Sequence, residues 1–365
     1  MTSDKDMRFM KRVLDLACKG LGKVSPNPMV GAVIVRDDRI IGEGFHRKFG
    51  GPHAEINAIE NAVESPRGAE FYVTLEPCSH HGKTPPCVER IIELDPSRVI
   101  IGTRDPNPLV SGRGIAALKD QGIPVDVGIL EQECRRLNEV FFAFMERGTP
   151  FVTIKYAQTL DGRIASSTGD SRWISSLKSR RFAHRLRSRH DAILVGIGTV
   201  LADDPDLTVR LVRGRNPVRV VVDSQLAIPV DARLLANQDQ ARTVIITSRG
   251  SNPSRREQLA HQGIDVIVAG EREQGRLDLK EALVELGKRG LSSVLVEGGS
   301  AIITSCLREG LADRLVVITA PRILGKGIDA VGDLGRIAVN QSLNLRVERL
   351  TGSGGDIIVD ARFPG

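Results

Sequence analysis

The chain has 365 residues, which corresponds to two domains at roughly 100–200 residues per domain. Hydrophobic residues make up 41% of it, so packed cores are available and disorder is excluded as the general state. The net charge of +6 at pH 7 suits nucleic acid or phosphorylated small molecules equally well. No run approaches the roughly 20 apolar residues that cross a bilayer, and residues 1–12 lack the apolar core of a signal peptide. We therefore expect a cytoplasmic protein without a membrane partner.

In the first half, apolar spacing and turn signals predict alternating helices and strands. In chain order these are helix 6–21, hairpin strands 29–35 and 40–44, helix 53–63, strand 71–75, helix 87–94, strands 98–102 and 125–128, and helix 130–146. The sequence Arg147-Gly148-Thr149-Pro150 then interrupts the pattern. We expect a boundary there, with domains at 1–147 and 150–365.

The second half repeats strands and helices, which is typical of a largely parallel sheet covered by helices. The predicted strands are 151–157, 192–195, 218–222, 243–247, 264–268, 293–296 and 315–319, and the predicted helices are 175–189, 279–288 and one after Ser300.

The five cysteines are too few and too scattered for a disulfide framework. Cys78 and Cys87 lie close together in a loop rich in proline and histidine, which indicates a metal site. Cys18, Cys134 and Cys306 fit buried positions in which cysteine behaves as a small hydrophobic residue.

A zinc centre is the main prediction from the residues themselves. His53 opens a predicted helix, Cys78 follows a strand and a proline, and Cys87 opens another helix. One imidazole and two thiolates suit zinc, and three protein ligands leave a fourth position for water, whose pKa zinc lowers to about 7. This pattern predicts a zinc-dependent deaminase that hydrolyses an amino group off a nitrogen heterocycle.

Glu55 is the predicted acid and base of that reaction, because it lies two residues after the histidine and is not needed as a ligand. A closed structural zinc site, with His80 or His81 as the fourth ligand, is an alternative. It leaves both Glu55 and Pro77 unexplained.

The spacing of the cysteines departs from the general nucleobase-deaminase pattern, which is Cys-x-x-Cys. Residues 79–86 separate the two cysteines here, and this longer loop would reshape the mouth of the pocket.

Two features of the second half are ambiguous from the residues alone. Glu297-Gly298-Gly299-Ser300 joins a strand to a helix, and its amides could bind a phosphate or form only a tight turn. The basic helix 175–189 is either a solvated face or a patch for phosphate or nucleic acid. Aromatic residues make up 4% of the chain, so base-stacking platforms are scarce.

With these motifs in view, the sequence resembles the bifunctional riboflavin-biosynthesis deaminase–reductase family over essentially its whole length. The deaminase half matches at 25–32, at 53–55 and from Pro77 to Cys87, including the eight-residue gap; the reductase half matches at 155–165, 169–174, 199–205, 206–210 and 296–299. The resemblance implies an N-terminal cytidine-deaminase-like α/β/α domain and a C-terminal dihydrofolate-reductase-like α/β domain.

The resemblance also implies two reactions on a phosphorylated pyrimidine. The first is deamination of 2,5-diamino-6-(5-phosphoribosylamino)pyrimidin-4(3H)-one; the second is NADPH-dependent reduction of the ribosyl chain to 5-amino-6-(5-phosphoribitylamino)uracil. It assigns cofactor contacts to Ala157, Trp173, Thr199, Asp203, Ser224 and Gly299, and substrate contacts to Ser171, Arg187, Leu207, Arg210 and Glu297. The two arginines suit phosphate because guanidinium groups match its oxygens in a bidentate way.

Several expectations remain open at this point. Asn27, His46 and Lys83 are either pocket contacts or turn and surface residues. The partners expected are the phosphorylated pyrimidine and further copies of the chain, because enzymes of this size are commonly symmetric oligomers. The rival hypotheses are a nucleic-acid deaminase acting on tRNA, and a non-catalytic RNA- or phosphate-binding protein with a structural zinc.

Overall fold

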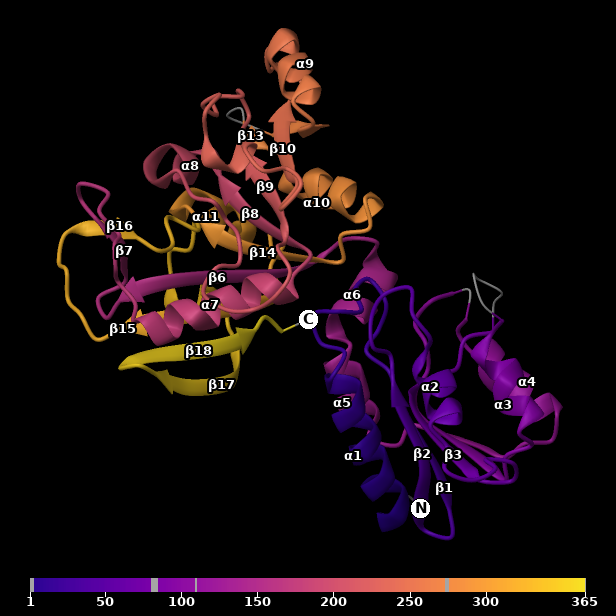
Figure 1. The fold of residues 1–365 in the computed structure, drawn as a ribbon. Coiled ribbons are helices and arrows are strands. Elements are labelled where there is room, and N and C mark those ends of the chain that lie inside the picture. The colour runs from indigo at the N-terminus through magenta and orange to yellow at the C-terminus, as the bar shows by residue number, and fades with distance from the viewer. Residues whose placement is uncertain (1–2, 80–84, 109, 273–275, 365) are drawn as a thin grey trace. The chain divides into compact units, whose positions relative to one another are not determined.

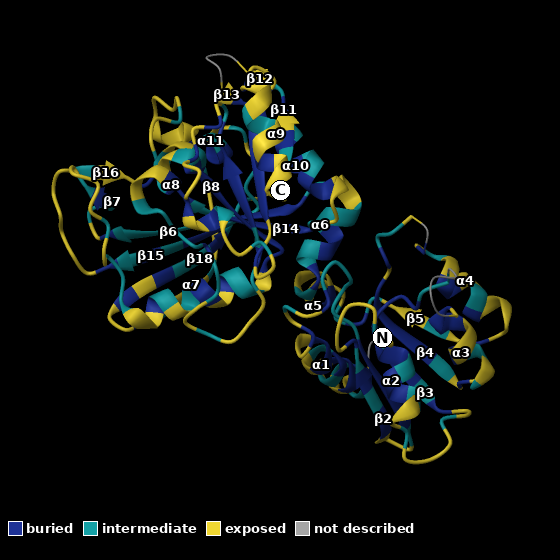
Figure 2. Ribbon diagram, turned by 45° about the horizontal axis from the view of Figure 1, so that its top comes forward, coloured by how far each residue is buried: buried dark blue, intermediate teal, exposed yellow. Residues whose placement is uncertain are grey.

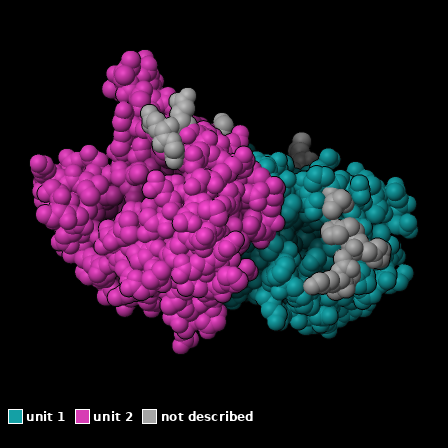
Figure 3. Space-filling view, turned by 90° about the horizontal axis from the view of Figure 1, so that it is seen from above, with its two compact units in different colours: residues 1–148 teal, residues 149–365 magenta. Residues whose placement is uncertain are grey.

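The computed structural model describes residues 3–79, 85–108, 110–272 and 276–364. The chain forms two compact units, Met1–Gly148 and Thr149–Gly365, coloured separately in Figure 3. Both units combine sheets with helices.

Unit 1 contains one five-stranded sheet with the order β2-β1-β3-β4-β5. Strands β1, β2 and β3 of this sheet are labelled in Figure 1. The hairpin strands β1 and β2 are antiparallel, β1 is antiparallel to β3, and β3, β4 and β5 are parallel. The elements are α1 (Asp4–Cys18), β1 (Gly31–Arg36), β2 (Arg39–Phe45), α2 (Ala54–Glu60), β3 (Glu70–Leu75), α3 (Cys87–Glu93), β4 (Arg98–Thr103), α4 (Arg113–Asp120), β5 (Val125–Val127), α5 (Glu131–Leu137) and α6 (Glu139–Arg147).

Alternation along the strands gives this sheet two apolar faces, each covered by helices. On one face Val33, Tyr72 and Ile100 pack against residues of α1 and α5. On the other, Ile34 and Val73 pack against residues of α2, α3 and α4. The sheet is accordingly the buried layer of an α/β/α sandwich (Figure 2).

Unit 2 is built on a nine-stranded sheet with the order β11-β10-β9-β8-β14-β6-β15-β18-β17. Its elements are β6 (Phe151–Thr159), β7 (Arg163–Ser166), α7 (Leu177–Arg189), β8 (Ala192–Gly196), α8 (Ile197–Asp203), β9 (Val218–Val222), η1 (Arg233–Leu235), β10 (Thr243–Ser248), α9 (Pro253–His261), β11 (Asp265–Ala269), β12 (Glu271–Arg272), β13 (Arg276–Leu277), α10 (Leu279–Lys288), β14 (Ser293–Gly298), α11 (Ser300–Arg308), β15 (Arg314–Ala320), β16 (Gly327–Asp329), η3 (Val339–Gln341), β17 (Arg346–Ser353) and β18 (Asp356–Arg362).

Seven strands of this sheet are parallel, from β11 to β15, as the alternating pattern predicts. Residues of α10 and α11 pack on one face, and residues of α7, α8 and α9 pack on the other. The pattern did not predict β17 and β18, which extend the sheet with an antiparallel edge. Most of β17 is exposed, so it lacks the apolar run that marks the buried strands.

The single helix predicted for 130–146 is wrong, because the chain breaks at Asn138 between α5 and α6. The Asn138 amide accepts a hydrogen bond from the Met29 amide at 2.8 Å and donates one to the Met29 carbonyl at 2.9 Å. These tertiary bonds fix the break next to the segment that leads into β1.

Cys134 and Cys306 are buried as predicted, but Cys18 is exposed near the end of α1, so the prediction for it is wrong. No helix within the described ranges is long and apolar enough to cross a bilayer.

Candidate functional site

The position of His53 depends on how closely α2 lies against β2. A Cβ atom at Gly44 would lie 2.4 Å from the Ala58 amide nitrogen and 2.5 Å from the Ala54 carbonyl oxygen. Only glycine allows this approach of helix and strand backbones. His53 is the N-cap residue of α2, so the packing fixes it beside the sheet.

The structure brings the three predicted zinc ligands together. His53 Nδ1 lies 3.7 Å from Cys78 Sγ and 3.3 Å from Cys87 Sγ, and all three ligand atoms lie within 4.8 Å of one another. Tetrahedral zinc with ordinary bond lengths requires about 3.6 Å between nitrogen and sulfur ligands. The donor set and its spacing therefore fit zinc.

The surroundings of Cys78 favour its thiolate form. The Cys87 amide donates to Cys78 Sγ at 3.3 Å. Hydrogen bonding from Cys87, together with His53, holds the pKa of Cys78 well below its ordinary value despite burial. A thiolate is the form that binds a metal.

Glu55 faces the same centre from the first turn of α2. It is buried, and burial raises its pKa to about 7, with the nearby Cys78 acting in the same direction. A carboxyl group that holds and releases a proton near neutral pH suits general acid–base work.

His46 contacts the His53 ring, and Asn27 contacts His46. The His46 and His53 rings meet edge to face with centroids 5.4 Å apart. His46 Nδ1 donates to the Pro52 carbonyl at 3.0 Å, so its Nε2 accepts from the Asn27 amide at 3.3 Å. His80, His81 and Lys83 lie outside the described residues.

In unit 2, predicted cofactor residues come from the carboxyl-terminal halves or ends of four adjacent strands. Ala157 lies on β6, Thr199 follows β8, Ser224 follows β9 and Gly299 follows β14. Ligands of parallel α/β sheets bind at this edge. Gly299 has φ of +71°, and a Cβ there would lie 3.3 Å from Thr199 Oγ1.

Trp173 is 59% exposed, which excludes a role in the core. The guanidinium of Arg180, on α7, lies 4.1 Å from the centroid of its ring. Arg172, the preceding residue, donates to the Asp203 carbonyl at 3.0 Å. These contacts place Trp173 and Asp203 on neighbouring segments.

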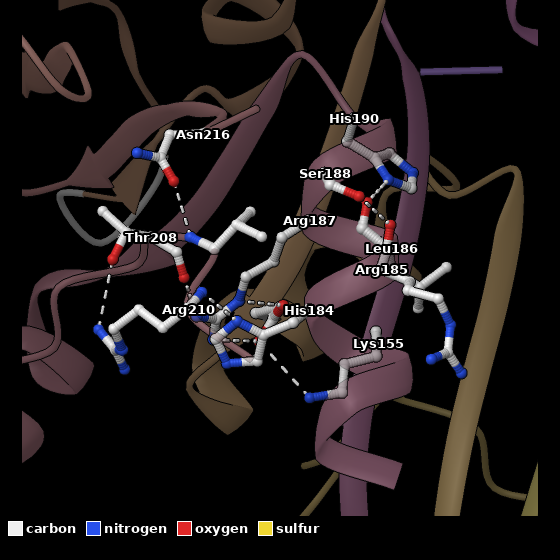
Figure 4. A network of polar contacts seen from close by, with 12 residues as sticks. Lys155, His184, Arg185, Leu186, Arg187, Ser188, His190, Thr208, Arg210 and Asn216 are labelled. Atoms are coloured by element: carbon white, nitrogen blue, oxygen red, sulfur yellow. Dashed lines mark hydrogen bonds and ion pairs between the residues drawn. The ribbon is translucent and has the colours of Figure 1, made fainter. Parts of the chain in front are cut away.

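Glu297, whose side chain is 5% exposed, is the centre of a charged cluster with Lys155 and Arg187, both of which are labelled in Figure 4. It lies where the register of β14 and β8 shifts, and such bulges redirect side chains. Arg187 Nε and Nη2 each donate to one Glu297 oxygen at 2.9 Å, and Lys155 Nζ lies 3.5 Å from Oε2. Burial alone would raise the pKa of Glu297, but Arg187 and Lys155 lower it to about 2.

The other predicted substrate residues differ in placement. Arg210 points away from Lys155 in Figure 4, and its guanidinium binds Asp206 at 2.5 Å. Leu207 packs its side chain into the core, so only its main chain is available to a ligand. Ser171 is half-buried on the segment before Trp173.

The remaining basic residues of α7 form a solvated face. The exposed ones are Lys178, Arg181, Arg185 and Arg189.

Two buried histidines make the stability of unit 2 depend on pH. His190 Nδ1 donates to the Leu186 carbonyl at 2.8 Å and Nε2 accepts from Thr153 at 3.0 Å, while His184 Nδ1 accepts from the Arg210 amide at 3.0 Å. Burial lowers the pKa of both side chains to about 4, with Arg187 adding to the effect at His184.

In the unfolded chain these histidines bind protons near pH 6.5. Their contribution to the free energy of unfolding is therefore fully present above that pH and is lost as the pH falls toward 4. His190 alone accounts for up to about 3 kcal/mol of this loss. His190→Asn keeps the donor to Leu186 but does not titrate. Denaturant unfolding from pH 7 to 4 should show a shallower loss in the variant, and equal slopes would contradict this role.

Comparison with known proteins assigns the chain to a family. Residues 3–103 match the cytidine and deoxycytidylate deaminase zinc-binding region, and residues 150–359 match the RibD C-terminal domain. The riboflavin biosynthesis protein RibD of Aquifex aeolicus is 44% identical over 360 residues, covering 98% of this chain and 99% of the relative. The chain belongs to the RibD family. It is a bifunctional deaminase and reductase of riboflavin biosynthesis, so the predicted family, fold class and enzyme classes are confirmed.

Solved structures of RibD-family proteins are similar to this chain over 99% of its length. A deaminase/reductase from Thermotoga maritima matches with a TM-score of 0.86 at 42% identity, covering 99% of both chains. Acinetobacter baumannii RibD matches with a TM-score of 0.89 at 35% identity, also covering 99% of both. The His53, Cys78 and Cys87 cluster therefore lies in a zinc-binding deaminase region, and unit 2 is the reductase part.

Two polar residues were not identified from the sequence. Lys155 lies within a segment that matches the family, and Glu76 directly precedes Pro77 and Cys78. Neither belongs to a local pattern, because each contacts residues distant in the sequence.

Proposed function

We propose that unit 1 deaminates 2,5-diamino-6-(5-phosphoribosylamino)pyrimidin-4(3H)-one to 5-amino-6-(5-phosphoribosylamino)uracil. The observation that carries this proposal is the His53, Cys78 and Cys87 cluster with Glu55 buried beside it. The Thermotoga relative is described as a diaminohydroxyphosphoribosylaminopyrimidine deaminase, which supports the choice of substrate.

His53, Cys78 and Cys87 would hold the zinc. A zinc ion held there would lower the pKa of a water molecule so that it ionises near neutral pH. The water oxygen bonds to the ring carbon that carries the amino group, and the two protons of that water pass in turn through the Glu55 carboxylate. The first goes to the ring nitrogen and the second to the leaving amino nitrogen, so that the carbon–nitrogen bond breaks and ammonia departs. His46 is held by hydrogen bonds to Asn27 and Pro52, and its ring packs against the His53 ring and helps to orient it.

We propose that unit 2 then reduces the ribosyl chain with NADPH to give 5-amino-6-(5-phosphoribitylamino)uracil. NADPH supplies a hydride to the ribose C1. Ala157, Thr199, Ser224 and Gly299 line the cofactor at the strand ends, which is the edge where parallel sheets bind ligands. Trp173 and Asp203 add contacts from the segments that Arg172 joins.

The substrate of unit 2 lies against the Glu297 cluster in this account. Lys155 and Arg187 carry two positive charges against the single charge of Glu297, so the cluster retains attraction for a phosphate. Arg210, Ser171 and the main chain of Leu207 complete the binding residues. Catalysis here rests mainly on positioning the ribose against the nicotinamide.

We further propose a cytoplasmic homo-oligomer that does not act on nucleic acid. Its interface is the outer edge of β17, which pairs only with β18 in the described chain. Val347 and Leu350 on this strand and Ile357 on β18 are 58%, 68% and 47% exposed. Exposed apolar edges of this kind favour pairing with another strand.

Two measurements on the purified protein test these assignments. Metal analysis should find about one zinc per chain, with NADPH oxidised faster than NADH when the deaminated product is supplied. Active protein without metal would contradict the zinc assignment, and equal use of the two nucleotides would contradict the cofactor choice.

A further inference from the structure

Glu76 is a buried carboxylate for which the proposed reaction has no use. It is 3% exposed and lies between the end of β3 and the Pro77-Cys78 pair. No Lys or Arg side chain pairs with it within the described ranges. A buried negative charge needs compensation, so its hydrogen bonds are informative.

Four backbone amides supply that compensation. Oε1 accepts from Gly114 at 3.0 Å and Ile115 at 3.2 Å, and Oε2 accepts from Gly112 at 3.0 Å and Asp105 at 3.3 Å. All four donors lie on the segment that connects β4 to the first turn of α4. The carboxylate thus anchors this segment with both oxygens, each bound by two donors.

The same segment packs against the residue before Cys78. A Cβ atom at Gly114 would lie 2.3 Å from the Pro77 carbonyl oxygen. The Glu76 amide also donates to the Thr103 carbonyl at 2.9 Å, at the end of β4. Pro77 is therefore fixed between its own strand and the start of α4.

We propose that Glu76 is a positioning residue for the metal centre. By fixing Pro77 it holds Cys78 Sγ near His53 Nδ1 and opposite the Cys87 amide, so the site is formed before the metal binds. Supporting residues of this kind typically change metal affinity 10–100-fold when replaced. This inference rests on the zinc ligands of the proposed function.

Glu76→Gln tests the proposal with almost no change in side-chain shape. The amide keeps one oxygen and presents an NH₂ group to amides that are themselves donors. We expect the zinc dissociation constant, measured by competition with a chromophoric chelator, to rise about 10–100-fold. In cobalt-substituted protein the thiolate-to-metal absorption should also weaken, because Cys78 is no longer held in place.

Asp6→Asn is the matched control in the same unit. Asp6 is 2% exposed and binds Tyr72 of β3 and Arg98, but it does not contact the Pro77-Cys78 segment. Asp6→Asn should lower the stability of unit 1. Its zinc dissociation constant should stay within about 3-fold of that of the unchanged protein, which is a smaller change than the one expected for Glu76→Gln.

Unchanged zinc affinity in Glu76→Gln would overturn the proposal, as would an equal loss in Asp6→Asn. If Glu76→Gln does not fold, Glu76→Asp is judged by the same criterion, because it keeps the charge but cannot reach all four amides. Absence of zinc from the unchanged protein would instead refute the metal centre itself.

Discussion

Glu55→Gln lowers the rate of ammonia release by about 10²–10⁴-fold while the protein keeps its zinc. The glutamine fills the same buried space but has no carboxyl group that can take up and release a proton near neutral pH. Because Glu55 is not one of the three clustered ligand residues, metal content should not change. Ammonia release and metal content are measured on the same preparation.

Glu60→Gln is the control for this change, since Glu60 is an exposed residue on the same helix. It should leave ammonia release unchanged. In both variants NADPH oxidation from the deaminated product should continue, because that reaction belongs to unit 2. Rapid ammonia release by Glu55→Gln would refute the assigned role.

Glu297→Ala should have the largest effect on unit 2. It leaves Arg187 and Lys155, which are 14% and 12% exposed, without a counter-charge. Removing one partner of a buried ion pair typically costs about 3–5 kcal/mol. We expect a loss of this size in the free energy of unfolding of unit 2, together with loss of NADPH oxidation, while ammonia release persists.

A double-mutant cycle with Arg187→Ala isolates the pair from other effects. The double variant should be less destabilised than the sum of the single variants. Glu285→Ala, which breaks contacts with Lys288 and Arg289 on the surface of α10, should change stability little. Additive losses at 187 and 297 would show that the pair is not coupled.

The deaminase ligands could be predicted because they are carried by short motifs. His53 directly precedes α2, Cys78 lies three residues after the end of β3, and Cys87 is the first residue of α3, so local sequence determined where they lie. The cysteine spacing and matching segments also indicated the family. The exposed position of Trp173 could not be predicted, because a single tryptophan fits a core equally well.

Contacts between distant segments could not be predicted. Arg187 and Glu297 are 110 residues apart, and their pairing depends on α7 lying over a bulge in β14. Glu76 receives its bonds from a segment beyond β4, and the break at Asn138 depends on Met29. The antiparallel strands β17 and β18 could not be predicted for another reason. Most of β17 is exposed, so its sequence lacks the run of apolar residues that marks a buried strand.

One measurement tests the central claim that a single chain performs both steps in order. Purified protein is given the diaminopyrimidine substrate and NADPH, and ammonia and NADPH are followed together. We expect equal amounts of ammonia released and NADPH oxidised, with removal of zinc stopping both. The zinc-depleted protein should still oxidise NADPH when given 5-amino-6-(5-phosphoribosylamino)uracil. NADPH oxidation from the diaminopyrimidine without ammonia release would contradict the account.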